Sequence, residues 1–266
     1  MTKQNFEFKT EVKEILNLII HTLYTHKEIF LRELLSNASD ALNKVHFRSL
    51  TEANIYDKDQ ALEINITVDA EKGTLSIEDT GIGMSQDELI AQIGTIAHSG
   101  TKKFLKDMAE HKDKPADMIG QFGVGFYSVF MVADRVTIET RSFKTDSEAV
   151  FWESDGTGSY ELDTSSRRKR GTQITLYLKD EEKEFLEKDR IKSLVNQYSN
   201  FLAFPVNLEA EKINQPEALW RKSRQDISDD EYKSFYKEIT HDYMDPQHWE
   251  HLKSEAPVQF DSIIYF

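Results

Sequence analysis

The chain has 266 residues, enough for one large domain or two modest ones, and its composition (39% hydrophobic, 30% charged) is that of an ordinary globular protein. A net charge of -14 argues against nucleic acid or an anionic membrane as a partner. The absence of cysteine excludes disulfides and thiolate metal sites, and no apolar run reaches the roughly 20 residues of a membrane span. Because the first residues are polar and do not form a signal peptide, the sequence predicts a cytoplasmic protein.

Two helices are predicted near the start of the chain, over residues 10–24 and 27–47. The second has a leucine-rich apolar face and, opposite to it, a narrow polar stripe. The stripe consists of Glu33, Asn37, Asp40 and Lys44. Charged stripes usually face water, so this pattern alone does not distinguish a solvated surface from a functional site.

A β-hairpin is predicted over residues 62–79. Its second strand ends on Asp79, whose side chain shares a face with Leu75 and Ile77. A carboxylate that points into a core is costly unless it has a partner. Two glycines follow within four residues, where the backbone can turn sharply or let a ligand approach. A ligand-binding acid and an N-capping turn both fit this stretch.

A helix is predicted over residues 85–96, with Ser85 as the N-cap and Glu88 completing a capping box. Between residues 98 and 120 the hydrophobic periodicity is weak. A long stretch of this kind between regular elements is typical of a segment that responds to a ligand.

A glycine-rich loop follows at residues 120–125 and leads into an apolar helix predicted at 126–132. Such a loop presents unpaired backbone N–H groups and the positive end of a helix dipole, which suits a phosphate group. The sequence matches neither G-x-x-x-x-G-K-[ST] nor the three-glycine dinucleotide fingerprint. Walker-type and Rossmann proteins are therefore disfavoured, while a simple glycine turn between packed elements stays open as an alternative.

Three more strands, at residues 135–140, 149–153 and 172–178, and a helix at 186–201 complete the predicted compact unit. Thr172 lies on the inward face of the last strand, where its hydroxyl can bond a ligand or nearby backbone. Hairpin-linked strands with several helices indicate an α+β fold, in which helices cover one face of a largely antiparallel sheet.

From about residue 209 the composition becomes polar and charged, and Ser228 begins a capping box. His248 and His251 have the spacing of two metal ligands, but without a third ligand we interpret both as surface histidines. The chain stops within an apolar, strand-like run at residues 261–266, so we expect it to be part of a longer protein.

Six motifs stand out in chain order: residues 33–40 (ELLSNASD), 79–84 (DTGIGM), 94–97 (GTIA), 99–102 (SGTK), 120–128 (GQFGVGFYS) and 171–172 (GT). Together they resemble the ATP-binding motifs of the ninety-kilodalton heat-shock (HSP90) chaperones, in particular the bacterial members. The resemblance covers the whole chain and implies a two-layer sandwich of the Bergerat ATP-binding type. It implies an ATP-binding domain at 1–208 with a lid at about 94–125, followed at 209–266 by a linker and the start of a middle domain.

The resemblance assigns one group of residues to the adenine base. Asp79 would accept a hydrogen bond from the exocyclic amine, and Thr172 would support the same edge of the base. Gly83 and Met84 would line the base pocket. On this reading the buried carboxylate has a ligand as its partner.

A second group is assigned to the phosphates. Asn37 would ligate a Mg²⁺ ion that bridges them, and Glu33 would orient or deprotonate the attacking water. The other nucleotide-binding residues that the resemblance implies are Asp40, Ser99, Gly100, Gly120, Gln121, Phe122, Gly123, Val124, Gly125 and Phe126. Many family members carry lysine where this chain has His98. A lysine is permanently charged, whereas a histidine titrates near neutrality, so we assign this position no role in nucleotide binding.

The resemblance implies an ATP-dependent molecular chaperone of the stress response, whose slow ATP hydrolysis drives lid closure and the folding of client proteins. Its expected partners are clients, cochaperones and a second copy of the protein, joined through a C-terminal domain. The catalytic arginine of the family lies beyond Phe266, so we expect this chain to bind nucleotide well and to hydrolyse it poorly.

Two other ATP-binding classes are the alternatives. A histidine kinase needs a helical dimerisation segment with a phosphoacceptor histidine, which the N-terminal residues do not show. A gyrase-type or mismatch-repair ATPase acts on DNA, which the charge of -14 disfavours.

Overall fold

The computed structural model describes residues 26–95, 101, 104, 119–120, 123–254, 256 and 260–266. The chain divides into two compact units between Asn214 and Gln215. The helix predicted at 10–24 and most of the predicted lid lie outside the described residues. No helix in the described part of the chain is long and apolar enough to cross a membrane.

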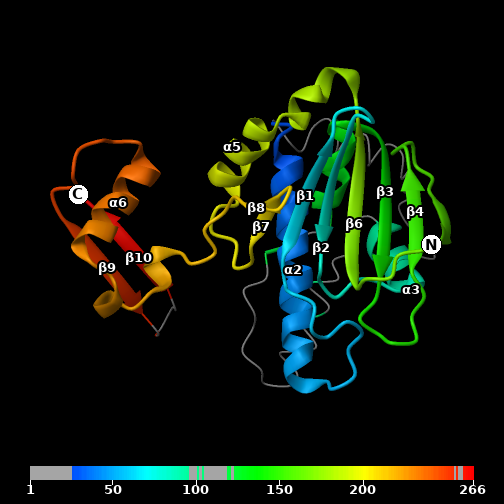
Figure 1. Cartoon of the computed structure of the whole chain (residues 1–266), viewed down its shortest axis with the longest axis horizontal. Helices are drawn as coiled ribbons and strands as arrows, with labels where there is room; N and C mark the ends of the chain where they lie inside the picture. The colour runs from blue at the N-terminus through cyan, green and yellow to red at the C-terminus, as the bar shows by residue number, and fades with distance from the viewer. Residues whose placement is uncertain are drawn as a thin grey trace, which may run out of the picture. The chain divides into compact units, whose positions relative to one another are not determined.

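The first unit is built on an eight-stranded sheet with the strand order β5-β4-β3-β6-β2-β1-β7-β8 (Figure 1). The strands are β1 Ile64–Asp69, β2 Thr74–Asp79, β3 Ala133–Arg141, β4 Val150–Ser154, β5 Glu161–Thr164, β6 Gly171–Leu178, β7 Val206–Leu208 and β8 Glu211–Lys212. All neighbouring strands are antiparallel except β1 and β7. The predicted hairpin and the three later strands are confirmed, whereas the sequence pattern misses β5, which carries a single apolar residue.

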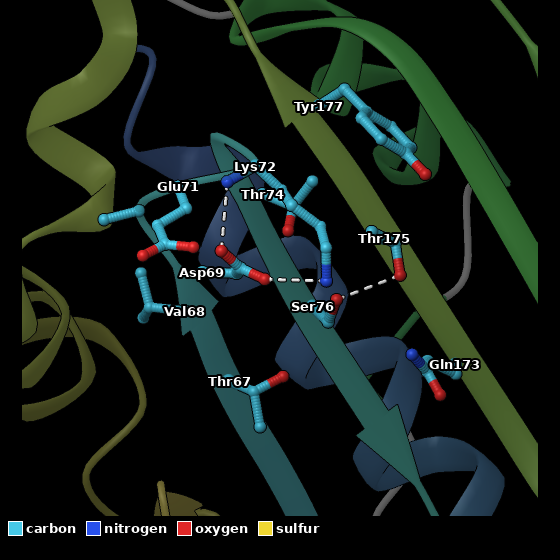
Figure 2. A pocket seen from close by; sticks show the side chains of 11 residues that line it. Thr67, Val68, Asp69, Glu71, Lys72, Thr74, Ser76, Gln173, Thr175 and Tyr177 are labelled. Atoms are coloured by element: carbon cyan, nitrogen blue, oxygen red, sulfur yellow. Dashed lines mark hydrogen bonds and ion pairs between the residues drawn. The ribbon is translucent and has the colours of Figure 1, made fainter.

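Helices cover one face of this sheet. They are α2 Ile29–Thr51, α3 Gln86–Ile93, α5 Lys188–Tyr198 and the 3₁₀ helices η2 Gly125–Met131 and η3 Asp180–Leu186. α2 contacts β1 and β2 and also η2 and α5. The opposite face carries polar side chains such as Ser76 and Thr175, whose hydroxyl oxygens lie 2.9 Å apart, with α2 behind the strands in Figure 2. This two-layer arrangement confirms the predicted α+β fold.

The core of the first unit lies between α2 and the sheet. Leu34 and Leu42 of α2 are at most 1% exposed, and they belong to the same apolar cluster as Ile66 of β1 and Leu75 of β2. Burial of each of these leucine side chains contributes about 1.5–3 kcal/mol to the stability of the fold. The helical spacing of the leucines therefore fixes which side of α2 faces the sheet and which side carries the polar stripe.

Two short helices differ in how well the sequence predicts them. α3 begins as expected, since the Ser85 N–H donates to Glu88 Oε2 at 2.8 Å and the Glu88 N–H donates to Ser85 Oγ at 3.4 Å. The segment predicted as a helix at 126–132 is instead the seven-residue 3₁₀ helix η2. Every residue from Phe126 to Met131 is buried there, in keeping with the apolar composition of the segment.

The second unit pairs a helix with a two-stranded hairpin. Its elements are η4 Leu219–Arg221, η5 Arg224–Asp226, α6 Asp229–Thr240, β9 Trp249–Ser254 and β10 Phe260–Tyr265. The capping box at Ser228 and the terminal strand are confirmed, and β10 pairs antiparallel with β9. The sequence pattern misses β9 because its residues are mostly polar or charged.

His251 corrects the prediction that both histidines lie on the surface. It is 9% exposed, and its Nε2–H donates to the Trp220 carbonyl at 3.0 Å, which leaves Nδ1 to accept from the Tyr232 hydroxyl at 2.6 Å. His248 is exposed, as predicted. Among the described residues, no group of three or more His, Asp or Glu side chains could hold a metal ion.

Tyr232→Phe should destabilise the second unit by about 1–3 kcal/mol, because it leaves the buried His251 Nδ1 without its donor. The measurement is urea unfolding followed by tryptophan fluorescence, since Trp249 stacks on Tyr232 at 5.4 Å between ring centroids. The matched control is Tyr236→Phe on the same helix, whose hydroxyl makes only a long 3.5 Å bond to Asp242. Equal unfolding midpoints for the two variants would contradict the assigned histidine bond.

Candidate functional site

A buried carboxylate forms the floor of the site. Asp79 ends β2 and is 7% exposed, and it stands opposite Thr172 at the start of β6. Asp79 Oδ1 accepts from the Gly81 N–H at 2.8 Å. Burial raises the pKa of Asp79 to about 7, against the opposing effects of the Gly81 N–H, the Arg167 guanidinium and the Thr172 N–H. The predicted inward direction of Asp79 is confirmed.

Two threonine hydroxyls extend this floor. Thr172 Oγ1 lies 2.9 Å from Thr140 Oγ1, and the Met84 N–H donates to Thr140 Oγ1 at 3.0 Å. Thr140 is absent from the sequence-based set of site residues. It sits on the inward face of β3 with Val136 and Ile138, so the argument that singles out Thr172 applies to it equally.

Gly83 brings the loop after β2 close to the end of β3. Its φ is +60°, and a Cβ at this position would lie 1.9 Å from the Arg141 carbonyl oxygen. Any other residue would force the loop away from β3 and would move Met84, which is tied to Thr140 through its N–H. The same loop reaches α2, where the Ile82 N–H donates to the Ala41 carbonyl at 3.0 Å.

At Asp40, the polar stripe of α2 faces protein rather than bulk solvent. Asp40 is 1% exposed and accepts from the N–H groups of Ile119 at 2.8 Å and Gly120 at 2.9 Å. Its Oδ2 also accepts from the Thr101 hydroxyl at 3.0 Å, and Lys44 Nζ donates to the same hydroxyl at 3.0 Å. Burial lowers the pKa of Lys44, an effect that nearby Asp40 and Asp79 oppose.

The other end of the stripe meets the glycine-rich loop. A Cβ on Gly125 would lie 2.2 Å from Glu33 Oε2, so the carboxylate packs directly against this glycine. Glu33 Oε1 accepts from Arg32 Nη2 at 2.5 Å. Asn37 is exposed, and its Oδ1 lies 3.2 Å from where a Cβ on Gly120 would be. Glu33, Asn37 and Asp40 thus line one side of the loop.

The remaining predicted site residues have different surroundings. The Phe126 side chain packs in the core, with its ring centroid 5.8 Å from that of Trp152, so only its backbone can serve the site. Gly123 and Val124 are partly buried in the loop that precedes η2. Ser99, Gly100, Gln121 and Phe122 lie outside the described residues.

Comparison with known families supports a nucleotide site. A family model described as "Histidine kinase-, DNA gyrase B-, and HSP90-like ATPase" matches residues 24–185, more than half of the chain. The chain belongs to this ATPase family. A second model, described as "Hsp90 protein", matches residues 207–266 and favours the HSP90 branch over the kinase and gyrase branches.

Curated relatives agree with this branch of the ATPase family. The chain is 48% identical to "Chaperone protein HtpG" of Cronobacter sakazakii over 97% of its own length and 43% of the relative. It is 47% identical to the HtpG protein of Pectobacterium atrosepticum, over 97% of the chain and 44% of the relative. For Salmonella typhi HtpG the identity is 46%, over 97% and 43%. The resemblance to the HSP90 chaperones is confirmed, and the chain spans less than half the length of these relatives.

The oxygen donors on the α2 stripe are of the kind that fits a magnesium ion shared with a substrate. Mg²⁺ prefers oxygen ligands and is commonly held by one or two protein oxygens together with substrate phosphates. Asn37 is exposed and its amide oxygen lies beside Gly120, and the carboxylate of Glu33 is on the same stripe.

Proposed function

We propose that this chain is the ATP-binding part of an HSP90-type chaperone and that its pocket takes ATP or ADP with Mg²⁺. The observation that carries the proposal is the buried carboxylate of Asp79. A carboxylate has about four acceptor sites, and backbone N–H groups of Gly81 and Thr172 occupy two of them. The remaining acceptors suit the exocyclic amine of adenine, with Thr172, Gly83 and Met84 around the base.

The α2 stripe and the glycine-rich loop form the phosphate half of the proposed pocket. Backbone N–H groups of the described loop residues 123–125 would hold phosphate oxygens, and Asn37 would hold the magnesium ion. When bound, Mg²⁺ neutralises phosphate charge. Because η2 is a short 3₁₀ helix, binding depends on the loop N–H groups more than on a helix dipole.

Glu33 is the proposed general base for hydrolysis. It takes a proton from water as the water oxygen attacks the γ-phosphorus, and the bond from that phosphorus to the ADP oxygen breaks. Oε2 of Glu33 points at the loop, while Oε1 is paired with Arg32, so one carboxylate oxygen is directed toward the phosphate side.

The activity of the longer protein is part of the same proposal. The relatives are named chaperones, and this supports a role in which slow ATP hydrolysis drives a conformational cycle on client proteins. Homodimerisation through a later domain, cochaperone binding, a stress-response role and a cytoplasmic location belong to this proposal. Nucleic acid and membranes are not among the proposed partners, in keeping with the net charge of -14.

Titration calorimetry of the chain with ADP, in the presence and absence of Mg²⁺, tests both halves of the pocket. We expect a single site whose affinity is higher with Mg²⁺, because the ion joins the phosphates to Asn37. Absence of binding under both conditions would refute the nucleotide pocket. Equal affinities with and without the ion would refute the magnesium assignment alone.

The affinity for ADP should depend on pH through Asp79. Its pKa of about 7 means that the carboxyl takes up a proton as the pH falls through neutrality, and the protonated form is a weaker acceptor for an amine. We therefore expect a plateau above pH 8 and a loss of about tenfold per pH unit well below 7. Adenosine, which has no titrating phosphate, serves as the control ligand, and a flat profile for adenosine would contradict the assignment.

A further inference from the structure

Arg170 is a fully buried cation next to the proposed adenine anchor. It is 1% exposed, and it precedes β6 in a run of four basic residues. Burying a guanidinium is costly unless its donors are satisfied. Burial lowers the pKa of Arg170, and nearby Asp57 and Asp79 oppose that effect. The hydrogen-bond partners of the Arg170 guanidinium therefore indicate what this buried charge stabilises.

The guanidinium of Arg170 donates to four backbone carbonyls from two separate loops. Nη1 donates to Thr80 O at 2.6 Å and to Gly81 O at 2.9 Å. Nε donates to Tyr56 O at 3.1 Å, and Nη2 donates to Asp57 O at 3.3 Å. The planar fork of an arginine can serve both loops at once, which a lysine cannot do.

One of these loops is also tied by backbone donors to the segments that flank β3 and β6. The Tyr56 N–H donates to the Phe143 carbonyl at 2.8 Å, and the Arg170 N–H donates to Asp57 Oδ2 at 3.2 Å. Arg170 therefore connects this loop to the loop that follows Asp79 and adds to the bonds that Thr80 makes with the backbone of Ala61 and Glu63.

The second loop contains the donor that orients the anchor. The Gly81 N–H lies 2.8 Å from Asp79 Oδ1, and Arg170 holds the carbonyls on either side of that N–H, those of Thr80 and Gly81. We propose that Arg170 is a positioning residue, which fixes the Thr80–Gly81 backbone so that the Asp79 carboxylate presents its free acceptors to adenine. This inference rests on the proposed nucleotide pocket.

A second buried cation provides the matched comparison. Arg167 also lies near Asp79, and its side chain is 6% exposed. It donates to Glu78 Oε1 at 2.8 Å and to the Arg170 carbonyl at 3.5 Å. Neither bond touches the Thr80–Gly81 loop, so Arg167 contributes charge to the anchor without fixing its backbone.

The charged groups around Asp79 come from several elements. Lys44 lies on α2, Arg167 and Arg170 lie before β6, and Glu78 precedes Asp79 on β2. Loss of a cation or of the Gly81 N–H raises the pKa of Asp79, since both stabilise its ionised form. Above pH 8, where Asp79 is fully ionised, a change in its pKa no longer affects ADP affinity. Displacement of the Thr80–Gly81 loop still lowers the affinity there.

The test is ADP affinity against pH for the parent chain, Arg170→Lys and Arg167→Gln, by titration calorimetry, which separates affinity from the folded fraction. Arg170→Lys keeps the charge but not the fork, so its plateau affinity above pH 8 should fall by at least about tenfold and its pH midpoint should rise. Arg167→Gln should raise the midpoint and keep the plateau within about twofold. Parent affinity at the plateau in folded Arg170→Lys would overturn the proposal.

If circular dichroism shows that Arg170→Lys is not folded, Asp57→Gly is the variant that tests the positioning role of Arg170. Asp57 is exposed and has φ +51°, so glycine is tolerated there while the acceptor for the Arg170 N–H is removed. A lowered plateau supports the proposal, and parent affinity overturns it.

If the parent chain binds no ADP, the proposed function fails, and the positioning claim is judged separately. The carboxyl pKa of Asp79 is then read by ¹³C NMR in the same variants. A higher Asp79 pKa in the deciding variant, Arg170→Lys or Asp57→Gly, supports the positioning role. An unchanged pKa overturns it.

Discussion

Asp79→Asn should lower the affinity for ATP and ADP by at least about 100-fold, because the buried acceptor loses its charge and its amide group places a donor against the adenine amine. A hydrogen bond to a charged group contributes about 1.5–3 kcal/mol, and the mispaired donor adds to that loss. The substitution is nearly isosteric, so the geometry of β2 and β6 should persist.

The stability of the same variant provides an internal check. Asp79 has a raised pKa in the folded chain, so ionising it costs stability as the pH rises from about 4 through 7. Asparagine has no such cost. At pH 8 the variant should therefore unfold at a urea concentration no lower than the parent chain, and lost binding cannot be attributed to unfolding.

Asp69→Asn is the matched control, since Asp69 lies at the end of the neighbouring strand β1 on the outer face of the sheet, where it binds Lys72 (Figure 2). An exposed pair of this kind contributes little, so ADP affinity should stay within about twofold. Unchanged affinity in Asp79→Asn, or a loss of equal size in Asp69→Asn, would show that the carboxylate of Asp79 is not the anchor.

The part of the site that the sequence predicts is the part that follows hydrophobic alternation and helical spacing. Asp79 and Thr172 fall on inward faces because they continue the pattern of apolar residues in their strands, and the structure pairs them across β2 and β6. The α2 stripe is predicted in the same way. Its leucines fix the buried face of the helix, and Asp40 is then directed toward Gly120.

The parts that the sequence does not predict depend on contacts between distant segments. Arg170 stands among four basic residues, and its burial arises from carbonyls about 90 and 114 positions earlier in the chain. No local pattern separates it from its exposed neighbour Arg168. The burial of His251 is also not predicted, because its partners come from η4 and α6. The polar residues of β9 give no alternation that would mark His251 as buried.

Glu33→Ala is expected to leave ADP binding within about twofold and to reduce ATP turnover of the longer protein by about 10²–10⁴-fold, the range that a positioned general base contributes. Binding should persist because the proposed adenine contacts lie at Asp79 and the phosphate contacts in the backbone of the loop. The measurements are calorimetry for ADP and steady-state phosphate release for ATP. Glu71→Ala, in the exposed hairpin turn between β1 and β2, is the control and should turn over at the parent rate.

The pairing of Glu33 with Arg32 makes the outcome of this experiment specific. If Glu33 served only to neutralise Arg32, alanine would leave an exposed cation near the phosphates and would raise nucleotide affinity without slowing the chemical step. If Glu33 is the base, single-turnover phosphate release slows while affinity stays constant, since only the transition state loses an interaction. Parent turnover in Glu33→Ala would therefore remove Glu33 from the chemistry and would leave its carboxylate as a surface partner of Arg32.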